Sequence, residues 1–248
     1  MVTRRKIMFL KKVTLLRDQI PHPNQYPFTI PAIQELDSIR FKTPISFFVG
    51  ENGTGKSTLL EGIAANIGFN PAGGSRSNIY EVDASESQLG DYLRLSWLPK
   101  ISNGFFFRAE TFYHFASYLE KVDETGFRDY GGKSLHQQSH GESFLSLFSN
   151  RFHGRAIYLL DEPEAALSPA RQLTFLRVMH NLTKQKNVQM IIATHSPILL
   201  GFPNAQIFSF DENQIREVSY EMTDHYSIMK YFLHNREKML AELFKEED

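Results

Sequence analysis

Residues 50–57 read Gly-Glu-Asn-Gly-Thr-Gly-Lys-Ser, which places glycines, a lysine and a hydroxyl at the spacing of a phosphate-binding loop. Glycines let backbone N–H groups wrap around an anion without interference from a Cβ atom. Lys56 is expected to reach the β- and γ-phosphates of a nucleoside triphosphate, and Ser57 to offer its hydroxyl to Mg²⁺. The ligand-binding residues that we predict here are Asn52, Gly53, Thr54, Gly55, Lys56, Ser57 and Thr58.

The segments around this loop have the pattern that such a motif requires. Residues 45–49 are a short apolar run typical of a buried strand, and the pattern from about 57 to 67 predicts a helix. A helix N-terminus adds the positive end of its dipole to the anion site. The strand, loop and helix together therefore predict a triphosphate site rather than an ordinary glycine-rich turn.

Two carboxylates follow another apolar run. Residues 156–160 predict a strand, and Asp161 and Glu162 come directly after it. In an open parallel sheet, ligands bind beyond the carboxyl ends of the strands. Asp161 is therefore expected to hold Mg²⁺, and Glu162 to polarise the attacking water as a general base.

A histidine and a capped helix complete the candidate set. His195 follows the predicted strand 188–193, where a contact with the γ-phosphate is the favoured interpretation. Ser139 and Glu142 have the spacing of a capping box before an apolar helix. The N-terminus of the same helix, where Gly141 lies, would also suit an anion. The residues alone leave both interpretations of this helix open.

The order of these segments resembles the ATP-binding-cassette (ABC) ATPase superfamily. Residues 138–142 (Gln-Ser-His-Gly-Glu) stand where that family has its Leu-Ser-Gly-Gly-Gln signature, shortly before the Walker B aspartate Asp161. His195 corresponds to the family's switch histidine. The resemblance implies an α/β P-loop NTPase fold, with a mixed central sheet flanked by helices and an antiparallel β region at the N-terminus.

The resemblance also implies partners and cofactors. It implies a homodimer formed head to tail on ATP binding, in which Ser139, Gly141 and Glu142 of one subunit contact the ATP bound by the other. The implied cofactors are ATP and Mg²⁺, and the implied catalytic residues are Glu162, His195 and Lys56. Glu110 is our candidate for the glutamine-loop position and hence for a third metal ligand beside Ser57 and Asp161. For adenine stacking, the resemblance leaves only Phe28 and Phe41 as guesses.

Departures from the transporter pattern suggest a branch of the superfamily. His140 and Glu142 replace the usual Gly and Gln, and residues 161–169 look more like the soluble ATPases of the OLD, RecF, Rad50 and SMC type. The segment between the phosphate loop and Ser139 is too short for coiled-coil arms. We therefore expect a stand-alone Mg²⁺-dependent ATPase switch in DNA repair or defence, acting on DNA or a protein effector. The alternative is the motor subunit of an ABC transporter. A nucleotide-gated module without turnover is less favoured, because Glu162 is present.

Composition sets the remaining bounds. The chain has 248 residues, a net charge of -1 and no cysteine, which excludes disulfides and thiolate metal sites. Arg4, Arg5 and Lys6 precede an apolar run too short for a signal peptide, and no run is long enough to span a bilayer, so we expect a cytoplasmic protein. We expect one ABC-type ATPase domain over residues 1–248, with a helical or loop insertion at about 68–138. The phenylalanine bias indicates core packing rather than base stacking.

The other elements follow from the apolar pattern. We expect an edge strand within residues 6–17, strands at 36–41, 93–98 and 104–108, a helix carrying Phe112 to Leu119, and a polar connection at 123–138. Ser168 and Pro169 predict the start of a further helix. A hairpin over 206–218 and a helix from about 225 complete the expected order.

Overall fold

The computed structural model describes residues 8–70, 73–75, 88–123, 125–127, 132–137, 140–150, 154–184 and 188–245, without the side chains of residues 113, 135, 140, 149 and 150. The statements below concern these residues. The segments at residues 76–87 and 128–131, which belong to the expected insertion, lie outside this part of the chain.

The main sheet has six strands in the order β5-β6-β7-β3-β8-β9. The strands are β3 (Ile45–Val49), β5 (Gly104–Arg108), β6 (Ala156–Asp161), β7 (Val188–Ala193), β8 (Gln206–Ser209) and β9 (Arg216–Val218). All neighbours are parallel except β8 and β9, which form an antiparallel hairpin. The apolar runs of β3, β6 and β7 are fully buried, as strands covered on both faces must be. The carboxyl ends of five strands therefore meet at one edge.

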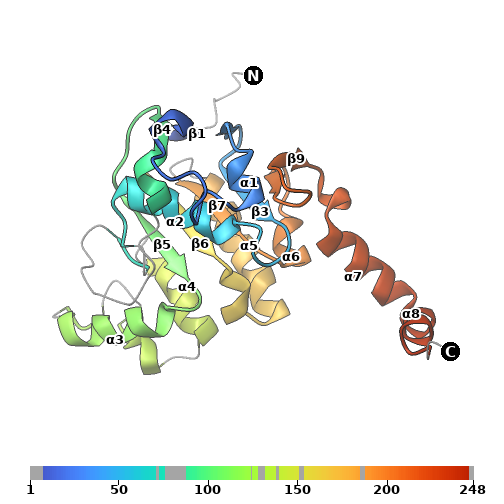
Figure 1. Ribbon diagram of the computed structural model, residues 1–248. Coiled ribbons are helices and arrows are strands. Elements are labelled where there is room, and N and C mark those ends of the chain that lie inside the picture. The colour runs from blue at the N-terminus through green and yellow to red at the C-terminus, as the bar shows by residue number, and fades with distance from the viewer. Residues whose placement is uncertain are drawn as a thin grey trace, which may run out of the picture.

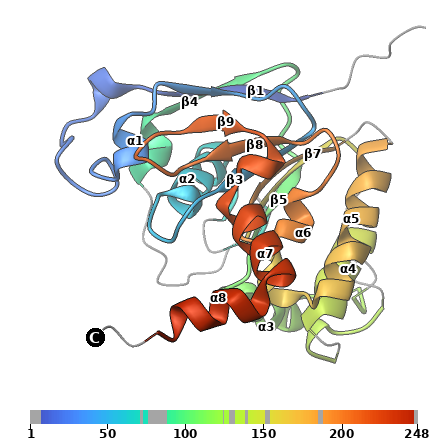
Figure 2. The ribbon, with the colours of Figure 1, turned by 90° about the vertical axis from the view of Figure 1, so that its right-hand side faces the viewer.

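Alternating side chains of the main sheet enter two separate cores. Phe47 packs on one face, in the core formed with α3 (Phe112–Val122), α4 (His140–Asn150), α5 (Pro169–Lys184) and α6 (Pro197–Leu200). Phe48 packs on the opposite face, beneath α2 (Lys56–Ile67). Figure 2 shows α4 and α5 on one side of the strands and α2 on the other, under a second, smaller sheet.

The smaller sheet is antiparallel, in the order β2-β1-β4. It consists of β1 (Leu10–Leu15), β2 (Ser38–Arg40) and β4 (Leu93–Trp97). The expectation that the first strand lies at an edge is wrong, because Val13 is paired with Ile39 on one side and with Leu95 on the other. The antiparallel region expected at the N-terminus is present.

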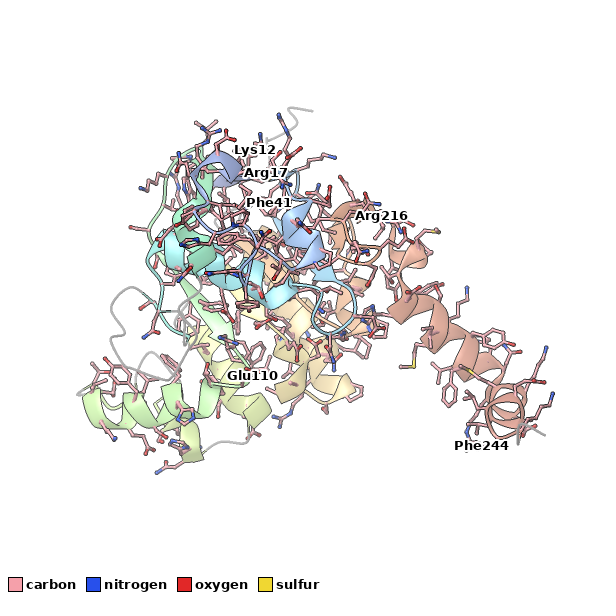
Figure 3. All side chains as sticks on the ribbon, viewed as in Figure 1. Lys12, Arg17, Phe41, Glu110, Arg216 and Phe244 are labelled. Carbon is pink, nitrogen blue, oxygen red and sulfur yellow. The ribbon has the colours of Figure 1, made fainter. Side chains whose placement is uncertain are left out.

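The remaining elements are short or peripheral. They are the helix α1 (Pro31–Gln34) and the 3₁₀ turns η1 (Arg17–Gln19), η2 (Gln88–Tyr92), η4 (Leu135–Gln137), η5 (Pro163–Ala166) and η6 (Tyr220–Met222). Two C-terminal helices, α7 (Asp224–His234) and α8 (Arg236–Leu243), bury no residue and project from the body of the molecule (Figure 1). Phe244, 76% exposed, lies near the far end of this arm (Figure 3).

A buried glutamine joins the two sheets. Gln189 of β7 is completely buried, and its Oε1 accepts hydrogen bonds from the backbone N–H groups of Phe9 and Leu10, both at 2.9 Å. Its Nε2 donates to the carbonyl of Leu10 at 2.9 Å. These bonds give hydrogen-bond partners to three backbone groups at the start of β1. Gln206 of β8 acts in the same way, since it donates to the carbonyl of Arg40 and accepts from the N–H of Lys42.

We predict that Gln189→Leu destabilises the chain by about 3 kcal/mol or more, because it leaves two N–H groups and one carbonyl buried without partners. The corresponding fall in melting temperature is on the order of 10 °C for a chain of this size. Calorimetry or thermal circular dichroism measures it. Gln34→Leu, at an exposed position of α1, is the control. A loss smaller than about 1 kcal/mol for Gln189→Leu would contradict the role given to this side chain.

Candidate functional site

The loop between β3 and α2 has the conformation that its glycines permit. Gly53 and Gly55 have φ angles of 81° and 99°, in the left-handed region. A Cβ atom on Gly55 would lie 2.9 Å from Cγ2 of Ile30, so a side chain is excluded there by space as well as by backbone angle. Asp211, which follows β8, accepts a hydrogen bond from the N–H of Glu51 at 3.0 Å and holds the start of the loop.

Lys56 curls back over this loop. Its Nζ donates to the carbonyl oxygens of Gly50 at 2.7 Å and Glu51 at 2.8 Å, and the residue is only 4% exposed. Burial lowers the pKa of Lys56 below its usual value, while the carboxylates of Glu162 and Asp161 oppose that shift. The ammonium group of Lys56 therefore lies within the phosphate-binding loop, next to the predicted phosphate site.

Ser57 and Asp161 meet although they are far apart in the sequence. The hydroxyl of Ser57 donates to Oδ1 of Asp161 at 2.9 Å. Burial raises the pKa of Asp161 to about 7, against the opposing effects of the Ser57 hydrogen bond and the Arg108 charge. A hydroxyl and a carboxylate side by side are the hard oxygen ligands that Mg²⁺ prefers, with water and phosphate oxygens filling its other positions. The residues present thus fit the metal that was predicted.

Arg108 is a member of this group that the sequence did not indicate as functional. It ends β5 directly opposite Asp161 in the parallel register. Its Nη1 lies 2.8 Å from Oε1 of Glu61 on α2, and its Nε lies 3.9 Å from Oδ2 of Asp161. The charged end of an otherwise apolar strand was the signal that could have revealed it. Arg108 holds α2 and β6 together beneath the predicted metal ligands.

Glu110 lies two residues further on, at the surface. Its side chain is 81% exposed, and its Oε2 pairs with Nη2 of Arg108 at 3.3 Å (Figure 3). Arg108 thus stands between Glu110 and the buried Asp161. Ligation of a metal by Glu110 stays a prediction.

Glu162 occupies a strained backbone position. Its φ and ψ angles are 50° and 51°, in the left-handed region that residues other than glycine seldom adopt. The N–H of Glu162 donates to the carbonyl of Ala193 at 3.0 Å, which fixes the turn to the end of β7. Strain of this kind tends to concentrate at functional sites. The turn brings Oε1 of Glu162 to 3.6 Å from Nε2 of His195.

His195 has two further anchors. Its backbone N–H donates to Oε1 of Glu164 at 2.6 Å, and its Nδ1 lies 2.9 Å from Nε2 of His225 on α7. Burial lowers the pKa of His195, and the nearby charge of Lys56 acts in the same direction. The sequence gave no sign of His225, because a lone histidine in an amphipathic helix resembles any other polar surface residue.

The helix expected to carry the signature begins at His140, while Gln138 and Ser139 lie outside the described residues. Gly141 is closely packed, since a Cβ atom there would lie 3.0 Å from the carbonyl oxygen of Ala166. Glu142 pairs with Arg171 of α5 at 3.3 Å. The roles of Ser139, Gly141 and Glu142 toward a nucleotide therefore stay predictions.

The other loop residues have structural contacts of their own. The hydroxyl of Thr54 donates to the carbonyl of Glu51 at 2.8 Å, and Asn52 and Gly53 form the exposed tip of the loop. The hydroxyl of Thr58 lies 3.4 Å from that of Tyr26, a residue that is 62% exposed.

The two guesses for adenine stacking are wrong. Phe28 and Phe41 are 5% and 3% exposed, and their rings pack against Tyr92 and Phe208 in the core. Neither ring offers a free face to a base.

Comparisons with known proteins give one family model and one curated relative. Residues 131–200, which include Asp161, Glu162 and His195, match the family model described as an AAA ATPase domain. The chain is 26% identical over 183 residues to a putative ABC transporter ATP-binding protein of Geobacter sulfurreducens, covering 65% of this chain and 64% of the relative's length.

Solved structures with a similar course of the chain include cbiO1 from Clostridium perfringens, part of the ABC transporter complex cbiONQ (18% identity, 94% of this chain and 99% of that one, TM-score 0.49). Another is an ATP-binding cassette of an ABC transporter in its ADP conformation (12% identity, 96% and 100%, TM-score 0.49).

The phosphate-binding loop between β3 and α2, the acidic end of β6 and the sheet order define an α/β P-loop NTPase fold with a mixed central sheet. A family model that matches residues 131–200 and a curated relative that is 26% identical support the ABC-type ATPases as the superfamily that this chain resembles. The curated relative is described as a putative ABC transporter ATP-binding protein, so it does not support the OLD, RecF, Rad50 and SMC branch that residues 161–169 suggested. No helix in the described part of the chain is long and apolar enough to cross a membrane.

Proposed function

We propose that the chain hydrolyses Mg²⁺-ATP and that two copies complete each other's sites. The observation that carries the proposal is the meeting of three distant segments at one sheet edge. Ser57 contacts Asp161 at 2.9 Å, and Glu162 lies 3.6 Å from His195. A phosphate-binding loop, a pair of metal ligands, a carboxylate for the water and a donor for the terminal phosphate are the parts that ATP hydrolysis requires.

Each of these side chains has a separate task in the proposed mechanism. Lys56 exchanges its bonds to the loop carbonyls for bonds to phosphate oxygens, while the loop N–H groups receive the remaining charge. Ser57 and Asp161 would hold the Mg²⁺, whose charge would offset that of the phosphates. Glu162 orients the attacking water and takes up its proton, and Nε2 of His195 donates to the terminal phosphate. Arg108 keeps Asp161 in place through the ion-pair network below it.

In the proposed dimer, each copy completes the nucleotide site of the other. In the arrangement that the resemblance implies, the start of α4 of one copy, with Ser139 and Gly141, contacts the phosphate held by the other copy. A helix N-terminus is suited to that contact because its N–H groups and dipole favour an anion. The chain would then associate on binding ATP and separate after hydrolysis.

A role of this cycle of ATP-driven association and separation in a transporter is better supported than a role in DNA repair or defence. The curated relative is described as a putative ABC transporter ATP-binding protein, although the chain spans only 64% of its length. If the chain is the motor of a transporter, we expect it to copurify with a multi-span membrane protein, and we expect duplex or single-stranded DNA to leave its turnover unchanged. DNA that raises turnover at low salt, with affinity falling steeply as salt rises, would instead favour the repair interpretation.

Replacing Lys56 by alanine tests the nucleotide site itself. We expect this variant to lose at least about tenfold in affinity for Mg²⁺-ATP, because one charge-assisted hydrogen bond to phosphate contributes on the order of 1.5 kcal/mol or more. Equilibrium binding of a fluorescent ATP analogue measures the loss. Lys100→Ala, at an exposed position, is the matched control. Equal affinities for Lys56→Ala and the wild type would overturn the proposed site.

A further inference from the structure

The root of the C-terminal arm reaches the phosphate side of the site. His225 is the second residue of α7, and its Nε2 lies 2.9 Å from Nδ1 of His195, with the two ring centroids 5.1 Å apart. The approach is fixed from both sides of His225. Thr223 caps α7 by accepting from the N–H of Tyr226, and the hydroxyl of Tyr220 donates to the carbonyl of Pro197, two residues after His195, at 2.9 Å.

The contact between the two imidazoles needs one proton and one lone pair. Burial and the charge of Lys56 lower the pKa of both His195 and His225, so both rings are neutral at pH 7 or above. In a neutral imidazole one nitrogen donates and the other accepts. Two arrangements are then available, and they differ in which histidine donates.

Glu162 decides between these arrangements. Its Oε1 lies 3.6 Å from Nε2 of His195. A carboxylate favours a proton on that nitrogen and disfavours a lone pair, so Nε2 of His195 carries the proton. The Nδ1 of the neutral ring is then the acceptor, and the proton in the 2.9 Å contact belongs to Nε2 of His225.

We propose that His225 is a positioning residue for hydrolysis: its Nε2–H donates to Nδ1 of His195 and holds His195 in the tautomer whose Nε2–H faces the terminal phosphate. This inference rests on the proposed ATPase function of the site. The opposite tautomer would present a lone pair to an anion and repel it. The first turn of α7 therefore sets the tautomer of His195, which follows β7, and this hydrogen bond connects the arm to the site.

A nucleotide-free measurement tests the hydrogen bond directly. In the chain labelled with ¹⁵N-histidine at pH 8, we expect a scalar coupling across the bond between Nε2 of His225 and Nδ1 of His195. The one-bond N–H coupling should appear on Nε2 of both rings. His225→Leu assigns the signals and must remove the coupling. A proton on Nδ1 of His195, or no coupling between the two rings, would overturn the proposal.

Turnover gives a second test. His225→Leu should lower kcat by about tenfold, the effect of losing one hydrogen bond that orients a donor, with little change in KM for ATP. His225→Gln retains an N–H at the same reach and should restore kcat to within about threefold of the wild type. His234→Leu, at the exposed end of the same helix, is the matched control and should have no effect.

A double variant separates positioning from folding. In a His195→Leu background, His225→Leu should cause no further loss of kcat, because the residue through which it acts is absent. A full additional tenfold loss there would overturn the proposal. Different results would refute the proposed ATPase function and the proposed role of His225. A wild-type chain that shows the N–N coupling but no ATP hydrolysis refutes the proposed function, whereas hydrolysis without the coupling refutes the role of His225.

Discussion

Replacing Glu162 by glutamine should reduce ATP hydrolysis by about 10² to 10⁴-fold, the usual contribution of a general base, while ATP should still bind. Glutamine keeps the size and the backbone turn of Glu162 but cannot take up the proton of the attacking water. ATP that is bound and not hydrolysed should then hold two copies together. Steady-state turnover measures the first effect, and light scattering after gel filtration in saturating Mg²⁺-ATP measures the second.

The control for this variant is Glu237→Gln, an exposed glutamate of α8 that is distant in sequence from every predicted site residue. It should match the wild type in turnover and in apparent mass. A Glu162→Gln chain that hydrolyses ATP at the wild-type rate would exclude this carboxylate as the base. A chain that binds ATP tightly but stays a monomer would refute the sandwich dimer and leave the ATPase site standing.

The second large effect concerns stability and pH at Asp161. Burial raises its pKa to about 7, well above the value of the unfolded chain. Between about pH 4 and pH 7 the folded chain therefore binds the proton more strongly than the unfolded chain, and stability falls as the pH rises through this range. Three pKa units correspond to at most about 4 kcal/mol.

Asp161→Asn should remove this loss, because asparagine carries no charge and its side-chain oxygen still accepts from Ser57. At pH 8, without metal or nucleotide, we expect the variant to melt up to about 10 °C above the wild type, and at pH 4.5 we expect the two to melt together. Turnover of Mg²⁺-ATP should fall sharply at both values, since one predicted metal ligand is lost. The exposed Asp91→Asn is the control. A gain that is the same at both pH values would contradict the assignment to Asp161.

The central strands, the phosphate-binding loop and the residues at the strand ends could be predicted from the sequence. Their signal is local: β3 and β6 are unbroken apolar runs, and each is followed at once by the polar residues that the site uses. Because parallel strands end at the same edge, placing Ser57, Asp161, Glu162 and His195 together required only that order.

What the sequence did not reveal depends on pairing between distant segments. The central place of β1 follows from its two partners, β2 and β4, and from Gln189 beneath it, none of which leaves a mark on residues 10–15. Arg108 finds Glu61, and His195 finds His225, only after the sheet and α7 are in place. The sequence also does not show which side chains are exposed to solvent. For that reason Phe41 was a candidate for stacking on a base.

The buried glutamines have a consequence for how the chain opens. Strand β7 is bonded through Gln189 to the smaller sheet near its start, and through the carbonyl of Ala193 to the turn at Glu162 at its end. Gln206 adds a second such connection from β8. Exposing the backbone of β1 to solvent therefore breaks bonds of the strands that carry the site. The amide protons of β1 should exchange with water only in openings that also dismantle β7, so the two sheets form one cooperative unit.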